Sequence, residues 1–370
     1  MNIGIPVELS GDNRLALTPE SVALLVESGN SVFVETKAGD KIHFFDEKFE
    51  KAGAKIVFAH EEVFGRSELV VKAEKLTEEE VDFVKEEQII MAFHHLAVLP
   101  QETIEKLIEK KTTVIGYELI EDENGQLPVL YPTSEIAGQM SIQIAAEYLK
   151  IIRGGRGIVL GGIPGVPPAV IVIIGAGTVG RNACMAALGA GAQVIVLDRD
   201  INKLREIERL FQKRVITSLA NRKSIEKAIS LADVVIGAVL IKGEKSPHVI
   251  TKDMLKLMKK GSLIIDLSID QGGCVETSRP TTPQSPVFRV KGITHYCIPN
   301  IPSCVGWTGT LALNNVLFPY VELLCENGLE KALQKSYALR KGIYIYRGIP
   351  IHHVLEKVFG YKAKKIESLL

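Results

Sequence analysis

The middle of the chain reads Val170-Ile171-Val172-Ile173-Ile174-Gly175-Ala176-Gly177-Thr178-Val179-Gly180. Five β-branched residues in succession are typical of a parallel strand that is buried on both faces. The glycines that follow have the spacing Gly-x-Gly-x-x-Gly and precede a helical segment, residues 181–188. A second apolar run, residues 193–197, ends in Asp198. The order of strand, tight turn, helix, strand and acid predicts one βαβ unit that binds a dinucleotide.

Each glycine of this turn has its own part in a dinucleotide site. Gly175 permits the tight turn, Gly177 lets a pyrophosphate approach the backbone, and Gly180 lets the helix pack close to the strand. The free N–H groups at the start of the helix, from Gly177 through Thr178 to Val179, are expected to bind the pyrophosphate. Asp198 is placed to accept hydrogen bonds from a ribose 2′-hydroxyl and would repel the 2′-phosphate of NADP, so we expect NAD(H). The alternative is a glycine-rich turn in an α/β domain that binds no nucleotide.

Size and composition are those of a globular protein with two domains. The chain has 370 residues, of which 46% are hydrophobic and 24% charged, and this length commonly forms two domains. The formal net charge is zero, which argues against a nucleic acid or a membrane surface bound through bulk charge. The five cysteines fit no zinc-binding spacing, so we expect reduced thiols. No signal peptide and no uncharged apolar run of about 18 residues occurs, so we expect a cytoplasmic protein.

Strands and helices alternate from residue 1 to about residue 128, which predicts a parallel sheet without a glycine motif of its own. A helix is expected over residues 135–152, entered through Thr133 and Ser134, followed by a connector rich in glycine and proline. The segment from about residue 311 reads as helical and is expected to pack back on the first sheet.

The predicted fold class is therefore α/β, with two Rossmann-like doubly wound parallel sheets and a cleft between them. We expect a discontinuous substrate domain of residues 1–128 plus 307–370. Residues 129–306 are expected to form the NAD-binding domain.

Several motifs, in collinear order over nearly the whole chain, resemble the alanine dehydrogenase family, which is related to the NAD-binding part of the proton-pumping transhydrogenase. They are Gly4-Ile5-Pro6, Asn13-Arg14-Leu15-Ala16-Leu17-Thr18-Pro19, His95-Leu96-Ala97, Ser134-Glu135-Ile136-Ala137-Gly138, Gly161-Gly162-Ile163-Pro164-Gly165-Val166, Gly175 to Gly180, Asp270-Gln271-Gly272-Gly273-Cys274, Ser278-Arg279-Pro280-Thr281-Thr282 and Asn300-Ile301-Pro302. The run Asp-Gln-Gly-Gly-Cys points to alanine dehydrogenase rather than to transhydrogenase.

The resemblance implies an activity and a way of assembly. The activity is the reversible reductive amination of pyruvate with ammonia and NADH, which gives L-alanine. Members of the family bind the oxo acid in the cleft between a catalytic and an NAD domain. They are usually hexamers and sometimes dimers, so we expect a homo-oligomer.

The resemblance also implies the roles of individual residues. Arg14 would hold the substrate carboxylate, His95 would be the general acid and base at the carbonyl oxygen, Asp270 would act near the nicotinamide, and Asn300 would line the substrate pocket. Cofactor contacts are expected from residues that follow the strands or flank the loops of the second domain. They are Ser134, Asp198, Val239, Leu240, Leu267, Ser268, Ile269, Asp270, Arg279, Ile298 and Ile301.

Without the family, three of these residues have both a functional and a structural interpretation. Arg14 lies in a polar loop, where its planar fork suits a carboxylate, but a solvated surface arginine is the alternative. His95 ends an apolar strand, where such folds place ligands, and imidazole suits proton transfer; the alternative is a packed histidine. Asp270 follows a buried strand, and a carboxylate that caps a turn is its alternative. The neighbouring His94 points the other way on a strand and is expected to be structural.

The chain departs from the family at a substrate-binding lysine. Members usually carry Lys-x-Lys-Glu-Pro after the fourth strand, and the second lysine binds substrate; here the chain reads Lys72-Ala73-Glu74-Lys75-Leu76. Glu74 takes the lysine position, and a carboxylate there should repel the carboxylate of pyruvate. Lys75 would reach the site through a local shift of the loop, because on a regular strand it faces the opposite side. Alternatively Lys72 reaches the site, or Glu74 serves another substrate, one that carries an amino group.

Two further positions depart from the family. Trp307 stands near the expected hinge, in Val305-Gly306-Trp307-Thr308-Gly309-Thr310, where members usually have a cation. Some members bind a metal through a carboxylate and a histidine of the last long helix; here those positions are Leu323 and Asn327, so we expect no metal. These departures leave two alternatives to an alanine dehydrogenase: a paralogue that reduces another 2-oxo acid or imine, or an NAD-binding protein without turnover.

Overall fold

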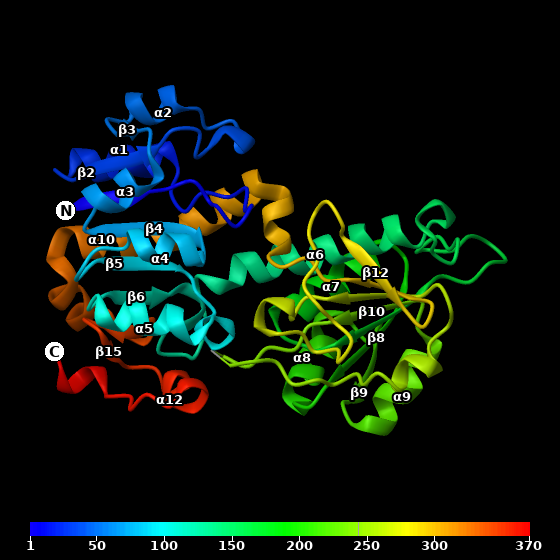
Figure 1. Cartoon of the computed structure of the whole chain (residues 1–370). Helices are drawn as coiled ribbons and strands as arrows, with labels where there is room; N and C mark the ends of the chain where they lie inside the picture. The colour runs from blue at the N-terminus through cyan, green and yellow to red at the C-terminus, as the bar shows by residue number, and fades with distance from the viewer. Residues whose placement is uncertain (243) are drawn as a thin grey trace. The chain divides into compact units, whose positions relative to one another are not determined.

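The structure is a computed structural model that describes residues 1–242 and 244–370, and it divides into two compact units. Unit 1 comprises Met1–Thr133, Lys242–Glu244 and Pro302–Leu370. Unit 2 comprises Ser134–Ile241 and Lys245–Ile301. Both ends of the chain belong to unit 1, where Figure 1 draws the blue N-terminal elements and the red C-terminal elements on opposite sides of the cyan strands.

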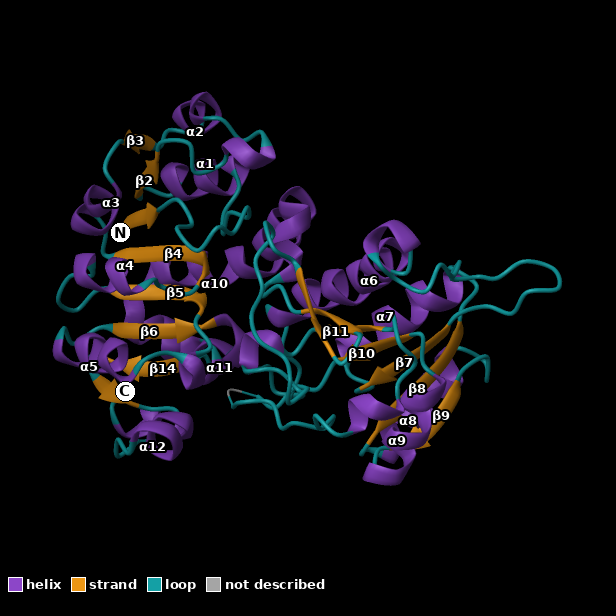
Figure 2. Ribbon diagram, turned by 45° about the vertical axis from the view of Figure 1, so that its right-hand side comes forward, coloured by secondary structure: helices purple, strands orange, loops and turns teal. Residues whose placement is uncertain are grey.

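Unit 1 is built on an eight-stranded sheet (Figure 2). In spatial order its strands are β15 (Ile349–Pro350), β14 (Ile343–Tyr346), β6 (Thr113–Gly116), β5 (Ile89–Phe93), β4 (Leu69–Glu74), β1 (Asn2–Ile5), β2 (Ser31–Glu35) and β3 (Lys55–Val57). The six strands from the N-terminal part are parallel, as predicted. The edge made by β14 and β15 is antiparallel and was not predicted.

Helices cover both faces of this sheet. One face packs on α1 (Pro19–Glu27), α2 (Asp46–Lys51) and α10 (Gly306–Lys335), which has a break at Gly328. The other packs on α3 (His60–Arg66), α4 (Glu78–Phe83), α5 (Gln101–Glu109) and α12 (His353–Phe359). The short α11 (Tyr337–Lys341) leads into β14. Thr18 caps α1, where its side chain accepts the N–H of Ser21 and Pro19 follows, as the sequence predicts.

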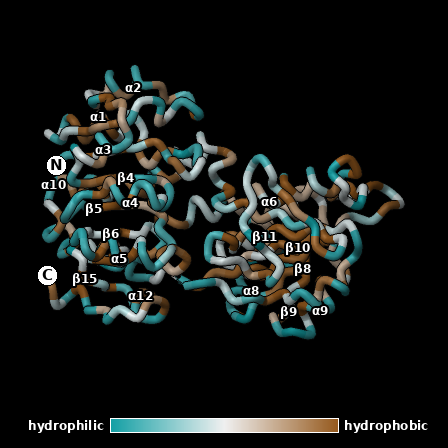
Figure 3. The backbone as a smooth tube through the Cα atoms, viewed as in Figure 1, coloured by the Kyte–Doolittle hydropathy of each residue, from teal (hydrophilic) through white to brown (hydrophobic). Residues whose placement is uncertain are grey.

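Unit 2 is built on a seven-stranded sheet. In spatial order its strands are β12 (Val287–Val290), β13 (Ile293–Tyr296), β11 (Leu263–Asp266), β10 (Val234–Gly237), β7 (Val170–Ile174), β8 (Gln193–Asp198) and β9 (Ile216–Leu219). All pairs are parallel except β12 with β13. The strands β8 and β10 are brown in the hydropathy view of Figure 3, as expected for strands buried on both faces. The predicted α/β class with two mostly parallel sheets is confirmed.

The helices of unit 2 are α7 (Thr178–Gly189), α8 (Ile201–Leu210), α9 (Arg222–Leu231) and most of α6 (Leu130–Tyr148). The predicted start of α6 at Glu135 is wrong, because the helix already begins at Leu130. Pro132 lies in its first turn, where a missing backbone N–H costs no helical hydrogen bond, so Ser134 lies inside the helix rather than before it. Within the described residues, no helix combines the length and the apolar character that a membrane span requires.

Candidate functional site

The glycine turn of unit 2 has the geometry of a dinucleotide loop. Gly175 has φ +112°, and a Cβ there would lie 2.1 Å from the carbonyl oxygen of Ala238. A Cβ on Gly180 would lie 1.9 Å from the carbonyl oxygen of Gly175, so α7 packs close to the end of β7 only with glycine there. A Cβ on Gly177, in contrast, would meet nothing within 4 Å. The turn is therefore unobstructed on the side of Gly177.

The start of α7 offers its N–H groups without a side-chain cap. Gly177 is the N-cap residue, and among the described residues no side-chain hydrogen bond caps the first turn, which contains Thr178 and Val179. Asp198, at the end of β8, accepts the N–H of Ala176 at Oδ2 (2.6 Å) and that of Asp200 at Oδ1 (2.8 Å). The carboxylate thus ties the end of β8 to the glycine turn and is half-buried beside it. Each oxygen retains a second lone pair that suits a ribose hydroxyl.

The loop after β11 is held by Asp266, a residue that the sequence analysis did not single out. Asp266 is fully buried and accepts the backbone N–H groups of Ser268, Cys274 and Val275. Ser268 Oγ in turn accepts the N–H of Val239 (3.0 Å), which lies directly after β10. Two of the expected cofactor contacts, at the ends of neighbouring strands, are therefore brought together by one hydroxyl.

Asp270 and Asn300 also lie together in unit 2. Asp270 stands in the 3₁₀ turn η6 (Ile269–Gln271), and its Oδ1 accepts the backbone N–H of Asn300 (2.9 Å). Asn300 adopts the left-handed conformation, with φ +53°. The remaining expected cofactor contacts differ in exposure. Ile269, Ile298 and Ile301 are buried, Leu267 is half-buried, Arg279 is exposed, and Leu240 is 51% exposed.

In unit 1, the guanidinium of Arg14 is buried, and one of its nitrogens has no hydrogen-bond partner among the described residues. Its Nε and Nη2 donate to Asp12 (Nη2 to Oδ2, 2.8 Å), and the residue is 2% exposed. Nη1 is buried and finds no hydrogen-bond partner among the described residues. Burial lowers the pKa of Arg14, but the nearby carboxylates, Asp12 first and then Glu74 and Glu8, together outweigh burial and raise it. The surface-arginine alternative is excluded for this residue, and a charged donor is available to a ligand.

The side chains of His95 and Arg14 both contact the ring of Phe93. The His95 imidazole stacks on Phe93 with ring centroids 6.2 Å apart, and the Arg14 guanidinium carbon lies 5.7 Å from the centroid of the same ring. His94 points away and is fully buried, and burial lowers its pKa to about 4. The end of the strand therefore holds His95 against Phe93, the ring that Arg14 also contacts, and buries His94.

Lys72 belongs to a buried charge cluster. Its ammonium lies 2.5 Å from Glu80 Oε1 and 3.0 Å from Glu8 Oε2, and its side chain is fully buried. Glu80 Oε1 also lies 3.2 Å from His60 Nε2. The other ring nitrogen of His60, Nδ1, lies 2.7 Å from Glu35 Oε2. Because two carboxylates already hold the ammonium, the idea that Lys72 binds substrate finds no support in this geometry.

The pairing of β4 with β5 is irregular where the lysine motif falls. Val71 pairs with Met91 and Glu74 pairs with Phe93, so β4 contains one residue more than β5 over this step. Paired residues project to the same face, so Glu74 shares the face of Phe93, and its charge contributes to the raised pKa of Arg14. Lys75 follows, half-buried, with its backbone N–H donated to Glu74 Oε1. The pairing thus sets Glu74 on the face of Phe93, close enough to Arg14 for its charge to act on the guanidinium.

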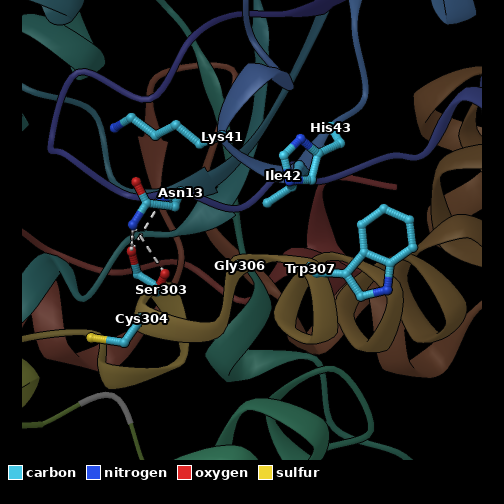
Figure 4. Close-up of a pocket in the computed structure, with 8 residues that line it drawn as sticks. All are labelled: Asn13, Lys41, Ile42, His43, Ser303, Cys304, Gly306 and Trp307. Carbon is cyan, nitrogen blue, oxygen red and sulfur yellow. Dashed lines mark hydrogen bonds between the residues drawn. The ribbon is translucent and has the colours of Figure 1, made fainter.

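A separate pocket of about 490 Å³ lies in unit 1 (Figure 4). Its lining comes from the loop before Arg14, the turn before α2 and the start of α10: Asn13, Lys41, Ile42, His43, Ser303, Cys304, Gly306 and Trp307. The Asn13 amide donates to Ser303, and Trp307 packs on Phe44. Trp307, the residue that replaces a cation, therefore borders this pocket, and neither Arg14 nor His95 lines it.

The positions expected for a family metal lie one helical turn apart in α10. The Asn327 amide donates to the carbonyl oxygen of Leu323 (3.0 Å). In the part of the chain that the structure describes, no group of three or more His, Cys, Asp or Glu side chains is arranged to hold a metal. The expected absence of a metal stays a prediction.

Two α/β units, one with a dinucleotide turn and one with a buried arginine and a histidine that contact the same phenylalanine ring, define a two-domain dehydrogenase class. The model described as "Alanine dehydrogenase/PNT, N-terminal domain" matches residues 4–137, and "Alanine dehydrogenase/PNT, C-terminal domain" matches residues 141–353. The chain belongs to the alanine dehydrogenase/PNT family and is an alanine dehydrogenase-like oxidoreductase.

Individual relatives agree with this assignment. The chain is 41% identical to the alanine dehydrogenase of Staphylococcus epidermidis over 100% of both chains, and 41% identical to that of Staphylococcus haemolyticus over 100% of this chain and 99% of the other. A solved L-alanine dehydrogenase matches with a TM-score of 0.88 at 41% identity, over 97% of this chain and 99% of the other. A transhydrogenase from Sinorhizobium meliloti, 22% identical with a TM-score of 0.77 over 95% of this chain and 99% of the other, shares the fold.

Proposed function

We propose that this chain catalyses the reversible, NAD-dependent reductive amination of pyruvate to L-alanine. In this reaction pyruvate, ammonium, NADH and a proton give L-alanine, NAD⁺ and water. The observation that carries the proposal is the pair of side chains on Phe93: a buried guanidinium with an unpartnered Nη1, and an imidazole at the end of β5. A 2-oxo acid offers the two matching groups, a carboxylate and an adjacent carbonyl oxygen.

The residues of unit 2 fit NAD(H). A phosphate group can approach Gly177, where a Cβ would meet nothing, and the first turn of α7 supplies uncapped N–H groups. Asp198 would accept the ribose hydroxyls and disfavour the 2′-phosphate of NADP. Ser268, Val239 and Asp270 stand at the ends of the neighbouring strands, where open parallel sheets bind ligands. When bound, NADH supplies the hydride.

The residues of unit 1 would hold the substrate and move protons. Arg14 Nη1 would bind the carboxylate while Asp12 keeps the guanidinium in place. His95 would give a proton to the carbonyl oxygen as ammonia adds to the carbonyl carbon and water leaves, and would take one back in the reverse reaction. Asp270 of unit 2 would assist the addition of ammonia, and Asn300, fixed to it through its N–H, would line the substrate pocket.

The test compares wild type with His95→Ala in the oxidation of NADH by pyruvate and ammonia. We expect His95→Ala to lower kcat by about 100-fold or more, as the loss of a general acid and base commonly does, and to leave the affinity for NADH unchanged. His353→Ala, an exposed histidine of α12, is the control and should keep wild-type kcat. If wild type turns over no faster than His95→Ala, the assignment is wrong.

Glu74 supports a second candidate, a 2-oxo or amino acid that carries a further cationic group. Arg14 is already balanced by Asp12, and Glu74 adds a negative charge on the same face of the sheet. A second carboxylate beside the arginine favours a substrate with an ammonium group over pyruvate.

A panel of 2-oxo acids with and without an amino group separates the two candidates. The second predicts a higher kcat/KM for the amino-bearing acids and a loss of that preference in Glu74→Gln. The first predicts that pyruvate is the best substrate and that Glu74→Gln lowers its KM. An NAD-binding protein without turnover would bind NADH, as a fluorescence titration would show. It would not oxidise NADH in the presence of any 2-oxo acid of the panel.

A further inference from the structure

Glu118 is a buried carboxylate for which the proposed reaction has no assigned use. It stands in the 3₁₀ turn η3 (Tyr117–Leu119), directly after β6, and is 2% exposed. Three groups donate hydrogen bonds to it: the backbone N–H of His95 (2.6 Å) and the Tyr344 hydroxyl (2.9 Å) to Oε1, and the backbone N–H of His94 (3.2 Å) to Oε2. The Glu118 carboxylate is therefore held by three donors from other segments of the chain.

The backbone that Glu118 holds is strained. His95 adopts the left-handed conformation, φ +49° and ψ +46°, between β5 and the 3₁₀ turn η2 (Leu96–Val98). A non-glycine residue is uncommon in this region and persists only where its surroundings impose it. The carboxylate accepts two successive N–H groups at this point, so it fixes the bend that turns the imidazole of His95 out of the strand.

The same carboxylate also lies beside the ring of His95. Nδ1 is 3.9 Å from Glu118 Oε1, which is too far for a hydrogen bond. Phe93 stacks on the ring with an interplanar angle of 11°. The ring is therefore held on one side by Phe93 and faces the carboxylate with Nδ1, which leaves Nε2 for a ligand.

Tyr344 holds Glu118 in place from a distant part of the chain. It lies in β14, is fully buried, and its hydroxyl is the third donor to the carboxylate. Gly116 makes room for its ring, because a Cβ on Gly116 would lie 2.3 Å from Cε2 of Tyr344. The Tyr344 hydroxyl and the Glu118 carboxylate thus link the antiparallel edge of the sheet to the end of β5.

We propose that Glu118, held by Tyr344, is the positioning residue of His95: it fixes the bend at the end of β5 and thereby the direction of the imidazole. This inference rests on the proposed role of His95 in proton transfer. Glu118 touches neither substrate nor cofactor in it, and acts through His95 alone.

The test uses Glu118→Gln and Tyr344→Phe in the full chain. The glutamine NH₂ would face a donor, so we expect faster hydrogen exchange of the His94 and His95 amides and a kcat lowered by at least about tenfold. The KM for NADH should not change, because no contact in unit 2 is altered. Tyr344→Phe keeps both N–H bonds and loses one hydroxyl, so we expect kcat to fall by about threefold to tenfold.

Tyr117→Phe is the matched control. Tyr117 is also a fully buried tyrosine, and its hydroxyl donates to the carbonyl oxygen of Met91 (3.1 Å) rather than to Glu118. It should lose stability as Tyr344→Phe does but keep kcat. Equal losses of kcat in the two tyrosine variants would overturn the proposal, as would unchanged exchange at His95 in Glu118→Gln. If Glu118→Gln does not fold, Tyr344→Phe against Tyr117→Phe decides.

Failure of this proposal and failure of the proposed function give different results. If wild type does not turn over pyruvate, the proposed function is wrong, and amide exchange at His95 still shows whether Glu118 holds the bend. If wild type is active and Glu118→Gln keeps both wild-type kcat and wild-type exchange, the positioning role alone is wrong.

Discussion

Arg14 shows how a single side chain is prepared for a ligand. Asp12, two residues earlier, takes Nε and Nη2 of the guanidinium and also accepts the Arg14 backbone N–H (2.8 Å). Gly309 of α10 lets the side chain pass, because a Cβ there would lie 2.7 Å from Arg14 Cδ. The guanidinium therefore loses little rotational freedom when it binds a ligand, and its Nη1 has a fixed direction.

We predict that Arg14→Lys weakens substrate binding but not cofactor binding. One ammonium cannot pair with Asp12 and reach a ligand carboxylate in the way that a planar fork does. A hydrogen bond to a charged group contributes about 1.5–3 kcal/mol, so the KM for pyruvate should rise by about tenfold to 100-fold. Steady-state kinetics measure it, and fluorescence titration with NADH should give the wild-type dissociation constant. An unchanged KM would contradict the role of Arg14.

At the scale of one element, the start of α7 separates fold from function within a single turn. Gly180 is required by packing, since its Cβ would collide with the carbonyl oxygen of Gly175. Gly177 is not required by packing, since its Cβ would meet nothing within 4 Å. Gly189, the last residue of the same helix, also has open space.

We predict three different results for alanine at these glycines. Gly180→Ala should lower the free energy of unfolding of unit 2 by about 1–3 kcal/mol, the usual cost of overpacking. Gly177→Ala should leave stability within about 0.5 kcal/mol but weaken NADH binding by about tenfold or more, because its methyl group occupies the phosphate approach. Gly189→Ala is the control and should change neither. Denaturation followed by circular dichroism and titration with NADH measure the two effects; wild-type NADH affinity in Gly177→Ala would refute the assigned turn.

The short helix α4 links its own cap to the buried charges of unit 1. Thr77 Oγ1 accepts the N–H of Glu80, and Glu80 Oε2 accepts that of Thr77 (2.7 Å), which forms a capping box. The other oxygen of Glu80 contacts Lys72 and His60. The helix cap therefore also fixes the carboxylate that neutralises Lys72.

We predict that Thr77→Ala costs more stability than the same change in an exposed capping box. Loss of an N-cap commonly costs about 1 kcal/mol, and in α4 it also loosens the partner of a buried ammonium. Asn221→Ala at the exposed cap of α9 is the matched control, with a cost of about 0.5–1 kcal/mol. Denaturant unfolding measures both, and an equal or smaller cost for Thr77→Ala would contradict the link.

At the scale of the whole molecule, the buried cluster makes the stability of unit 1 depend on pH. Burial lowers the pKa of His60, but the carboxylates of Glu35 and Glu80 outweigh burial and raise it from 6.5 to about 9. Burial raises the pKa of Glu8 to about 7, opposed in part by Lys72. Both groups hold their proton more tightly in the folded state than in the unfolded chain. The contribution of His60 is therefore complete below pH 6.5 and is lost as the pH rises through 9.

We predict that the free energy of unfolding of unit 1 falls by up to roughly 3 kcal/mol from about pH 7 to about pH 9.5. The single tryptophan, Trp307, lies in unit 1 and is half exposed, so its fluorescence reports this unit during denaturant unfolding. His60→Gln should remove most of the slope, because glutamine does not titrate. A slope equal to wild type in His60→Gln would show that other groups cause it.

Assembly and location stay predictions at this scale. The resemblance implies a homo-oligomer, usually a hexamer, and light scattering after size-exclusion chromatography measures the mass directly. The expected cytoplasmic location rests on features of the sequence alone.

The sequence by itself determined what depends on neighbours along the chain. The glycine turn, Asp198 at the end of the next strand and the Thr18–Pro19 start of α1 are local patterns, and the structure has each as predicted. Local steric and hydrogen-bonding preferences act over a few residues, so a linear pattern suffices to predict them. The sequence also singled out Arg14 and His95 as candidate substrate-binding and catalytic residues, through the resemblance to the family.

Only the tertiary structure decided which charges meet. Tyr344 and Glu118 are 226 residues apart in the chain and share a hydrogen bond. Lys72 is held by Glu8 and Glu80 from two other segments, and the added residue in β4 sets Glu74 opposite Phe93. The pairing of strands from distant segments depends on how the whole sheet buries its faces. The hydrophobic periodicity of one segment does not specify which other strand it pairs with. Contacts of this kind fix the surroundings of each charged side chain, since burial and the nearest partner act on its charge and its direction.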